Sequence, residues 1–125
     1  MFDIQEDERS GVTIFRFVGD LVFGPPAQLV VDMVATRMLV TWQTFVCDLS
    51  KVEQMDSSGV AAVLRAQEQA RQAGGHLIVL RPSRRVREVL TTAHLLPYMH
   101  IEEVEADAVR RALARDADRP GRAPR

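Results

Sequence analysis

The sequence has a single cysteine, no long apolar run and almost no net charge, and each shortage narrows the class of protein. Cys47 cannot form an internal disulfide and suits a small core residue, so a cytoplasmic location is the default expectation. No stretch approaches the roughly 18 consecutive apolar residues that a membrane-spanning helix needs. The first eight residues are acidic and lack the basic start and apolar core of a signal peptide.

Sequence signatures of catalysis and of metal binding are missing as well. A nucleophile elbow needs glycine two residues before and two residues after the serine, and neither Ser57 nor Ser58 has both. There is also no P-loop or Gly-x-Gly-x-x-Gly run. The three histidines lack metal-ligand spacing, and one cysteine leaves no soft ligand pair. With a net charge of -1, nothing draws the chain toward nucleic acid. We expect no enzyme, no metal or cofactor site and no direct nucleic-acid contact.

What the sequence does contain is the pattern of one α/β domain. The length of 125 residues suits a single core, and the 46% of apolar residues is ordinary for a globular protein. Residues 44–49 read as a strand buried on both faces, and residues 77–80 as a second such strand. Between them, residues 60–73 favour a helix, whose small residues recur at helical spacing and allow it to lie close to a sheet. Strand, helix and strand form a right-handed crossover between parallel strands.

The flanking segments complete the domain. We expect an opening hairpin of residues 2–8 and 12–18, a loop over 19–26, and a helix from there to about Leu39. Ser83 is a candidate N-cap for a helix over 84–93. A short last strand over 98–101 and a helix from Glu102 to about Asp116 follow. Residues 116–125 lie beyond the domain, and their proline, glycine and arginine content predicts a disordered tail.

Four residues, Asp56-Ser57-Ser58-Gly59, lie where the central strand gives way to the helix. Aspartate or serine at this point accepts hydrogen bonds from free helix N–H groups, so a plain N-cap is one interpretation. Two adjacent hydroxyl groups exceed what capping requires. The carboxyl end of a parallel strand is also where α/β folds present functional groups, which is the second interpretation.

These segments together resemble the STAS domain, the fold of bacterial anti-sigma factor antagonists and of the cytoplasmic tails of sulfate-transporter-type proteins. The resemblance rests on residues 47–50, 55–60, 74–75 and 82–96 and spans residues 2–115. It implies a mixed β-sheet of four to five strands with about four helices. A departure is Val22, which stands where an acidic residue usually follows the Gly-Asp-Leu of residues 19–21, and Val22-Phe23-Gly24 looks more like the transporter-tail branch.

In the antagonist branch, the resemblance implies binding to a serine-kinase anti-sigma factor, which frees the sigma factor. Phosphorylation of Ser57, or alternatively Ser58, would end that binding, and a serine phosphatase would restore it. The residues expected to meet the partner are Asp20, Asp56, Ser57, Ser58 and Gly59. The alternative is a scaffold or regulatory subunit of a transporter or stressosome-like complex, without a phosphorylation cycle.

A cluster of arginines leaves a further choice open. Arg81, Arg84, Arg85 and Arg87 could hold a phosphate by bidentate hydrogen bonds. A solvated helix face is the favoured interpretation, because charge runs usually face solvent.

Overall fold

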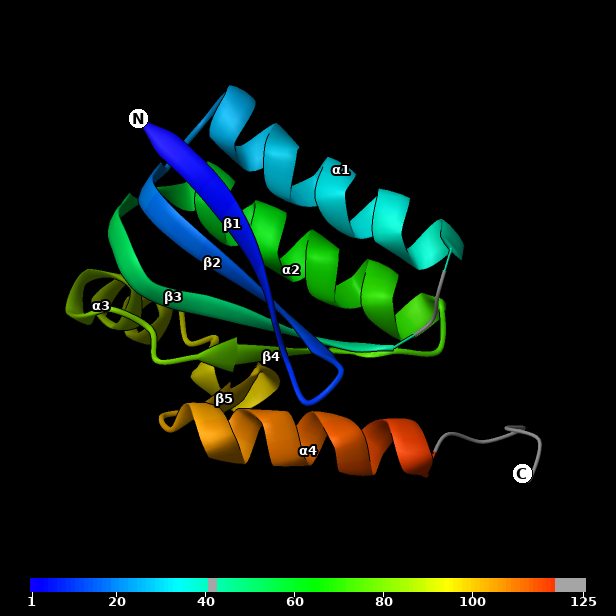
Figure 1. Ribbon diagram of the computed structural model, residues 1–125. Coiled ribbons are helices and arrows are strands. Elements are labelled where there is room, and N and C mark those ends of the chain that lie inside the picture. Colours follow the sequence, from blue (N-terminus) through cyan, green and yellow to red (C-terminus); the bar gives the residue numbers. More distant parts are fainter. Residues whose placement is uncertain (41–42, 119–125) are drawn as a thin grey trace.

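A computed structural model describes residues 1–40 and 43–118, in which five strands form one mixed sheet in the order β1-β2-β3-β4-β5 (Figure 1). Only β1 (Phe2–Arg9) runs antiparallel to its neighbour, β2 (Val12–Leu21). The other strands, β3 (Thr44–Met55), β4 (His76–Leu80) and β5 (His100–Glu102), continue the sheet in parallel. The expected mixed sheet of four to five strands is confirmed.

Helices cover both faces of this sheet. On one face lie α1 (Pro25–Val40) and α2 (Ser57–Gln72), while α4 (Glu105–Ala117) crosses the other (Figure 1). The shorter α3 (Arg84–Thr92) follows β4, and a 3-10 turn, η1 (Leu96–Tyr98), leads into β5. The four α-helices in the described residues agree with the expected number.

The period-two alternation of strand residues divides the core between the two faces. Odd-numbered strand residues such as Phe15, Phe45 and Val79 pack beneath α1, α2 and α3. Even-numbered residues form a smaller cluster with α4, made of Val12, Ile14, Val46, Ile78, Leu80, Ala108, Val109 and Ala112. Because successive side chains of a strand point to opposite faces, the continuous apolar runs of β3 and β4 serve both clusters.

The crossover unit at the centre has the predicted form. β3 and β4 are parallel, with Phe45 opposite Leu77 and Cys47 opposite Val79. The small-residue stripe of α2 is buried through its members Gly59, Ala62, Val63, Ala66 and Ala70. These side chains add little bulk, so α2 lies close to the sheet.

Two strands, β2 and β3, extend beyond their expected ends. β2 continues to Leu21, so the expected loop over 19–26 shrinks to the residues just before α1. β3 runs to Met55 by pairing with β2 alone, because β4 stops at Leu80, opposite Asp48. Past that point Ser83 takes over the free side of β3: its N–H donates to the Leu49 carbonyl (3.1 Å) and its hydroxyl to the Val52 carbonyl (2.7 Å). The residues of β3 alone gave no sign of this extension, because Ser83, which supports it, lies far along the sequence.

The C-terminal part also differs in its bounds. The last strand is displaced from the expected residues 98–101, because Tyr98 belongs to η1, and it ends at Glu102. The last helix therefore begins at Glu105 rather than Glu102. Near its end, an Asp116 carboxylate oxygen accepts hydrogen bonds from the N–H (2.9 Å) and hydroxyl (2.8 Å) of Thr44, at the start of β3.

The tail over residues 116–125 is predicted to be disordered. Its residues from 119 onward lie outside the part of the chain that the structure describes. Among the residues that are described, no helix is long and apolar enough to cross a membrane.

Candidate functional site

Asp56 caps α2 and also joins the helix start to the loop before α1. One carboxylate oxygen accepts a hydrogen bond from the Gly59 N–H at 2.9 Å, which is the predicted N-cap. The other accepts from the Phe23 N–H at 3.0 Å. The hydrogen bond from Gly59, followed by that from Phe23, holds the pKa of Asp56 below its ordinary value. The carboxylate is thus charged and fixed at neutral pH.

The two hydroxyl groups that follow are presented differently. Ser57 is the first residue of α2 and is exposed, whereas Ser58 is half-buried. Within the described residues neither hydroxyl makes a hydrogen bond. Ser57 is therefore open to another protein, as the hypothesis of a modifiable serine requires.

Gly59 sets how closely this helix start approaches the sheet. It is buried, and a Cβ atom at this position would overlap the carbonyl oxygen of Leu21 and lie 3.1 Å from Cγ of Met55. The backbone of α2 thus rests directly against the end of β2. Gly59 contributes to the site by this contact.

Asp20 lies at the same edge of the sheet, because β2 and β3 are parallel and Asp20 is in register with Gln54. Among the described residues, no hydrogen bond or ion pair joins its carboxylate to the Asp56–Gly59 turn. The residue that does reach the turn is Phe23, which is 80% exposed and donates its backbone N–H to Asp56. Sequence reasoning missed this neighbour, since only the fold brings the loop before α1 to Asp56.

Two shallow hollows flank the serines. The α1–α2 hollow, of about 450 Å³, is lined by Phe23, Ser58 and Arg65 among others. The α2–α3 hollow, of about 460 Å³, is lined by Met55, Asp56, Ser57, Val60, Arg85, Glu88, Val89, Thr92 and Ala93. Ser58 and Ser57 thus open toward opposite sides of α2. Arg85 is a second neighbour that the sequence alone did not identify.

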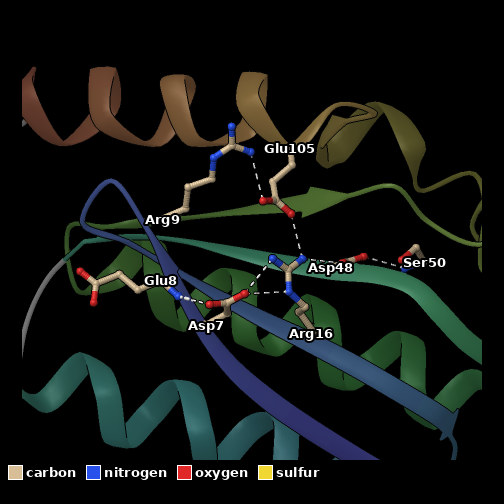
Figure 2. A network of polar contacts seen from close by, with 7 residues as sticks. All are labelled: Asp7, Glu8, Arg9, Arg16, Asp48, Ser50 and Glu105. Atoms are coloured by element: carbon tan, nitrogen blue, oxygen red, sulfur yellow. Dashed lines mark hydrogen bonds and ion pairs between the residues drawn. The ribbon is translucent and has the colours of Figure 1, made fainter.

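A separate charged cluster lies on the α4 face of the sheet (Figure 2). The guanidinium of Arg16 donates hydrogen bonds to Asp7 (3.0 and 3.2 Å), Asp48 (2.9 Å) and Glu105 (2.9 Å). Arg9 adds a second hydrogen bond to Glu105, at 3.1 Å. Strands β1, β2 and β3 are joined in this way to the first residue of α4.

The charges of this cluster are matched within it. Burial would raise the pKa of Asp48, but hydrogen bonds from Ser50 and Arg16 outweigh burial and lower it. The hydrogen bond from Arg16 likewise lowers the pKa of Glu105, and the three carboxylates raise the pKa of Arg16 above its ordinary value. These matched contacts join the strands to Glu105 and so hold the start of α4 on the sheet.

Three histidines, expected not to form a metal site, are distributed over β4, β5 and the segment after α3. In the described residues no group of three or more histidine, cysteine, aspartate or glutamate side chains could hold a metal ion.

Solved structures with the same fold include anti-sigma factor antagonists and an anion transporter. SpoIIAA of Bacillus is 25% identical, with TM-scores of 0.72 for its unphosphorylated form (91% of this chain, 97% of that one) and 0.65 for its phosphorylated form (89% and 98%). An anti-sigma factor antagonist from Mycobacterium paratuberculosis is 17% identical, with a TM-score of 0.75 over 90% of this chain and 95% of its own. Murine Slc26a9 is 19% identical, with a TM-score of 0.71 over 86% of this chain but only 18% of the transporter.

The similarities to the Mycobacterium paratuberculosis antagonist and to Slc26a9 show a shared fold alone, because the sequence identities are low. Among curated proteins, none matches the chain. Residues 3–108, most of the sequence, match the STAS domain family, and the chain therefore belongs to that family.

Proposed function

We propose that this STAS domain is an anti-sigma factor antagonist whose partner is a serine-kinase anti-sigma factor in the cytoplasm. The partner surface is centred on Ser57 and includes Asp20, Asp56, Ser58 and the loop that carries Phe23. Phosphorylation of Ser57 ends the binding, and a serine phosphatase restores it. The domain itself performs no catalysis in this scheme.

The observation that carries the proposal is the exposed hydroxyl of Ser57 beside a fixed carboxylate. Asp56 is held by two backbone N–H groups, so its carboxylate has a defined position next to Ser57. The similarity to SpoIIAA supports the same role, since that protein has been solved with and without phosphate.

Phosphorylation at Ser57 would disturb the partner far more than the domain. As the first residue of α2, Ser57 lies at the positive end of the helix dipole, where a phosphate is tolerated. The phosphate adds a charge of about -1.5 to -2 next to Asp56. A charge left unpaired in an interface costs roughly 2–5 kcal/mol, and 1.4 kcal/mol is about tenfold in affinity.

The test combines the cognate kinase, ATP and mass spectrometry with a binding measurement. We expect wild type to be phosphorylated on Ser57, Ser57→Ala to bind but never to be modified, and Ser57→Asp to bind at least about tenfold more weakly. Ser58→Ala is the matched control, because its hydroxyl opens toward the other side of α2; it should still be phosphorylated. Phosphate found only on Ser58 would move the role to that residue.

A second candidate, a scaffold or regulatory subunit without a phosphorylation cycle, is favoured by Phe23. Phe23 is 80% exposed, and Val22 stands where the antagonists usually carry an acid. Unchanged partner binding by Ser57→Asp, combined with loss of binding by Phe23→Ala, would favour this candidate over the first.

A further inference from the structure

The α2–α3 hollow brings one arginine into the neighbourhood of Ser57. Of the four clustered arginines, only Arg85 lines this hollow, and it shares it with Ser57 although the two lie on different helices. Arg84, its neighbour in sequence, has a side chain that is 94% exposed and does not line the hollow. Arg84 and Arg85 are both exposed, as expected of a solvated helix face, but Arg85 differs in bordering Ser57.

The guanidinium of Arg85 is weakly engaged. Its one contact among the described residues is an ion pair with Glu88, whose nitrogen–oxygen distance of 3.7 Å is too long for a hydrogen bond. The other oxygen of Glu88 already accepts from Arg84, at 3.2 Å. Arg87, in contrast, makes a short hydrogen bond of 2.6 Å to Glu103. Arg85 can therefore leave Glu88 at little cost, since exposed ion pairs contribute little.

Among the described residues that line the hollow, Arg85 is the one cation that could balance an added anion. The two carboxylates of the hollow belong to Asp56, which is fixed by backbone N–H groups, and to Glu88. A phosphate on Ser57 would add a larger negative charge than Glu88 carries. It would also offer several oxygens, which a guanidinium can contact in bidentate fashion.

We propose that Arg85 is the intramolecular partner of phosphoserine 57: once the phosphate is present, Arg85 turns from Glu88 to the phosphate and closes the α2–α3 hollow. This inference rests on the proposed phosphorylation of Ser57. Modification then removes partner-binding surface in two ways, by placing charge at the turn and by occupying the hollow beside it.

The test uses full-length protein with phosphoserine introduced directly at position 57 by genetic-code expansion, so no kinase is needed. A phosphorus NMR titration measures the second pKa of the phosphate in the Arg85 protein and in Arg85→Gln. We expect this pKa to be lower with Arg85 than with glutamine, because a nearby cation favours the dianion. Arg84→Gln is the matched control with the same loss of charge on the same helix, and it should titrate like the parent protein.

Two results would overturn the inference. The pKa could be the same in Arg85→Gln as in the parent, or Arg84→Gln could raise it as much as Arg85→Gln, which would indicate general charge rather than a specific pair. Either result would leave the proposed function standing. Conversely, failure of the cognate kinase to modify Ser57 would reject the proposed function, while the contact between Arg85 and an introduced phosphate would still be measured.

Discussion

At the scale of single residues, Gly59 shows how one missing side chain determines the position of the site. An alanine in an exposed helix is normally better than glycine by about 0.5–1 kcal/mol. Here the added Cβ would meet the backbone carbonyl of Leu21, and backbone cannot move aside as a flexible side chain can. The steric clash therefore outweighs the helix preference for alanine, and Gly59→Ala should lower the stability of the fold.

We expect Gly59→Ala to lower the free energy of unfolding by about 1–3 kcal/mol, the usual range for overpacking a closed site. Chemical denaturation followed by circular dichroism measures it. Ala61→Ser, at an exposed position of the same helix, is the control and should stay within about 0.5 kcal/mol of wild type. A Gly59→Ala variant as stable as wild type would mean that α2 can shift away from β2.

The sequence predicted this residue and its neighbours only in part. The capping role of Asp56 and the exposure of Ser57 follow from local rules, because a cap acts within a few residues of itself. Two further features depend on which elements become neighbours in space. They are the hydrogen bond from Phe23 to Asp56, and the hollow that Ser57 and Arg85 both line. No spacing in the chain encodes them.

At the scale of elements, the same contrast separates α2 from α4. The small-residue stripe of α2 was readable because it repeats at helical spacing, and its burial is confirmed. The contact between Arg16 and Glu105 that holds α4 could not be predicted, since the two residues lie 89 positions apart in the sequence. The length of β3 could not be predicted for a similar reason: past Asp48 its neighbours are β2 and Ser83 in place of β4.

The charged cluster makes the attachment of α4 sensitive to acid. Because the pKa values of Asp48 and Glu105 are lowered by folding, these groups stabilise the fold fully above their unfolded pKa values of about 4. That contribution is lost as the pH falls through the lower, folded values. Stability should therefore decline below about pH 4.

Arg16→Met should cost about 2–3 kcal/mol at pH 7, because it leaves Asp48, only 6% exposed, without its cation. We expect a smaller loss of stability than for breaking a fully buried ion pair, because the Arg16 side chain is 25% exposed. The difference from wild type should narrow toward pH 3, which denaturation at a series of pH values measures. Arg110→Met removes an exposed pair on α4 and is the control, expected within about 1 kcal/mol at pH 7. A pH-independent difference would show that the loss came from packing alone.

At the scale of the whole molecule, Cys47 reports how often the fold opens. Cys47 lies in the central strand and is 2% exposed, and burial of its thiol, with a further contribution from Asp48, raises the pKa of that thiol to about 12. The native protein therefore offers neither access nor thiolate to a thiol reagent at pH 8.

We expect Cys47 to react at pH 8 only as fast as the protein opens, and at the rate of a free thiol in denaturant. In the regime where opening is a rapid equilibrium, Gly59→Ala should be labelled about tenfold faster for each 1.4 kcal/mol of stability that it loses. Time-resolved labelling followed by mass spectrometry measures both rates. Rapid reaction of the native wild type would contradict the buried position of the thiol.

The hydrogen bonds between Asp116 and Thr44 have a consequence for the order of events during synthesis on the ribosome. Strands β1 to β4 and the helices α1 and α2 are complete by Leu80, so the face beneath those helices can begin to form while translation continues. The opposite face, with Val12, Ile14 and Val46, stays uncovered until α4 has emerged and its Asp116 can reach the start of β3. A nascent chain thus carries an exposed apolar sheet face until α4 has been added, so a chain stopped before α4 leaves Val12, Ile14 and Val46 uncovered.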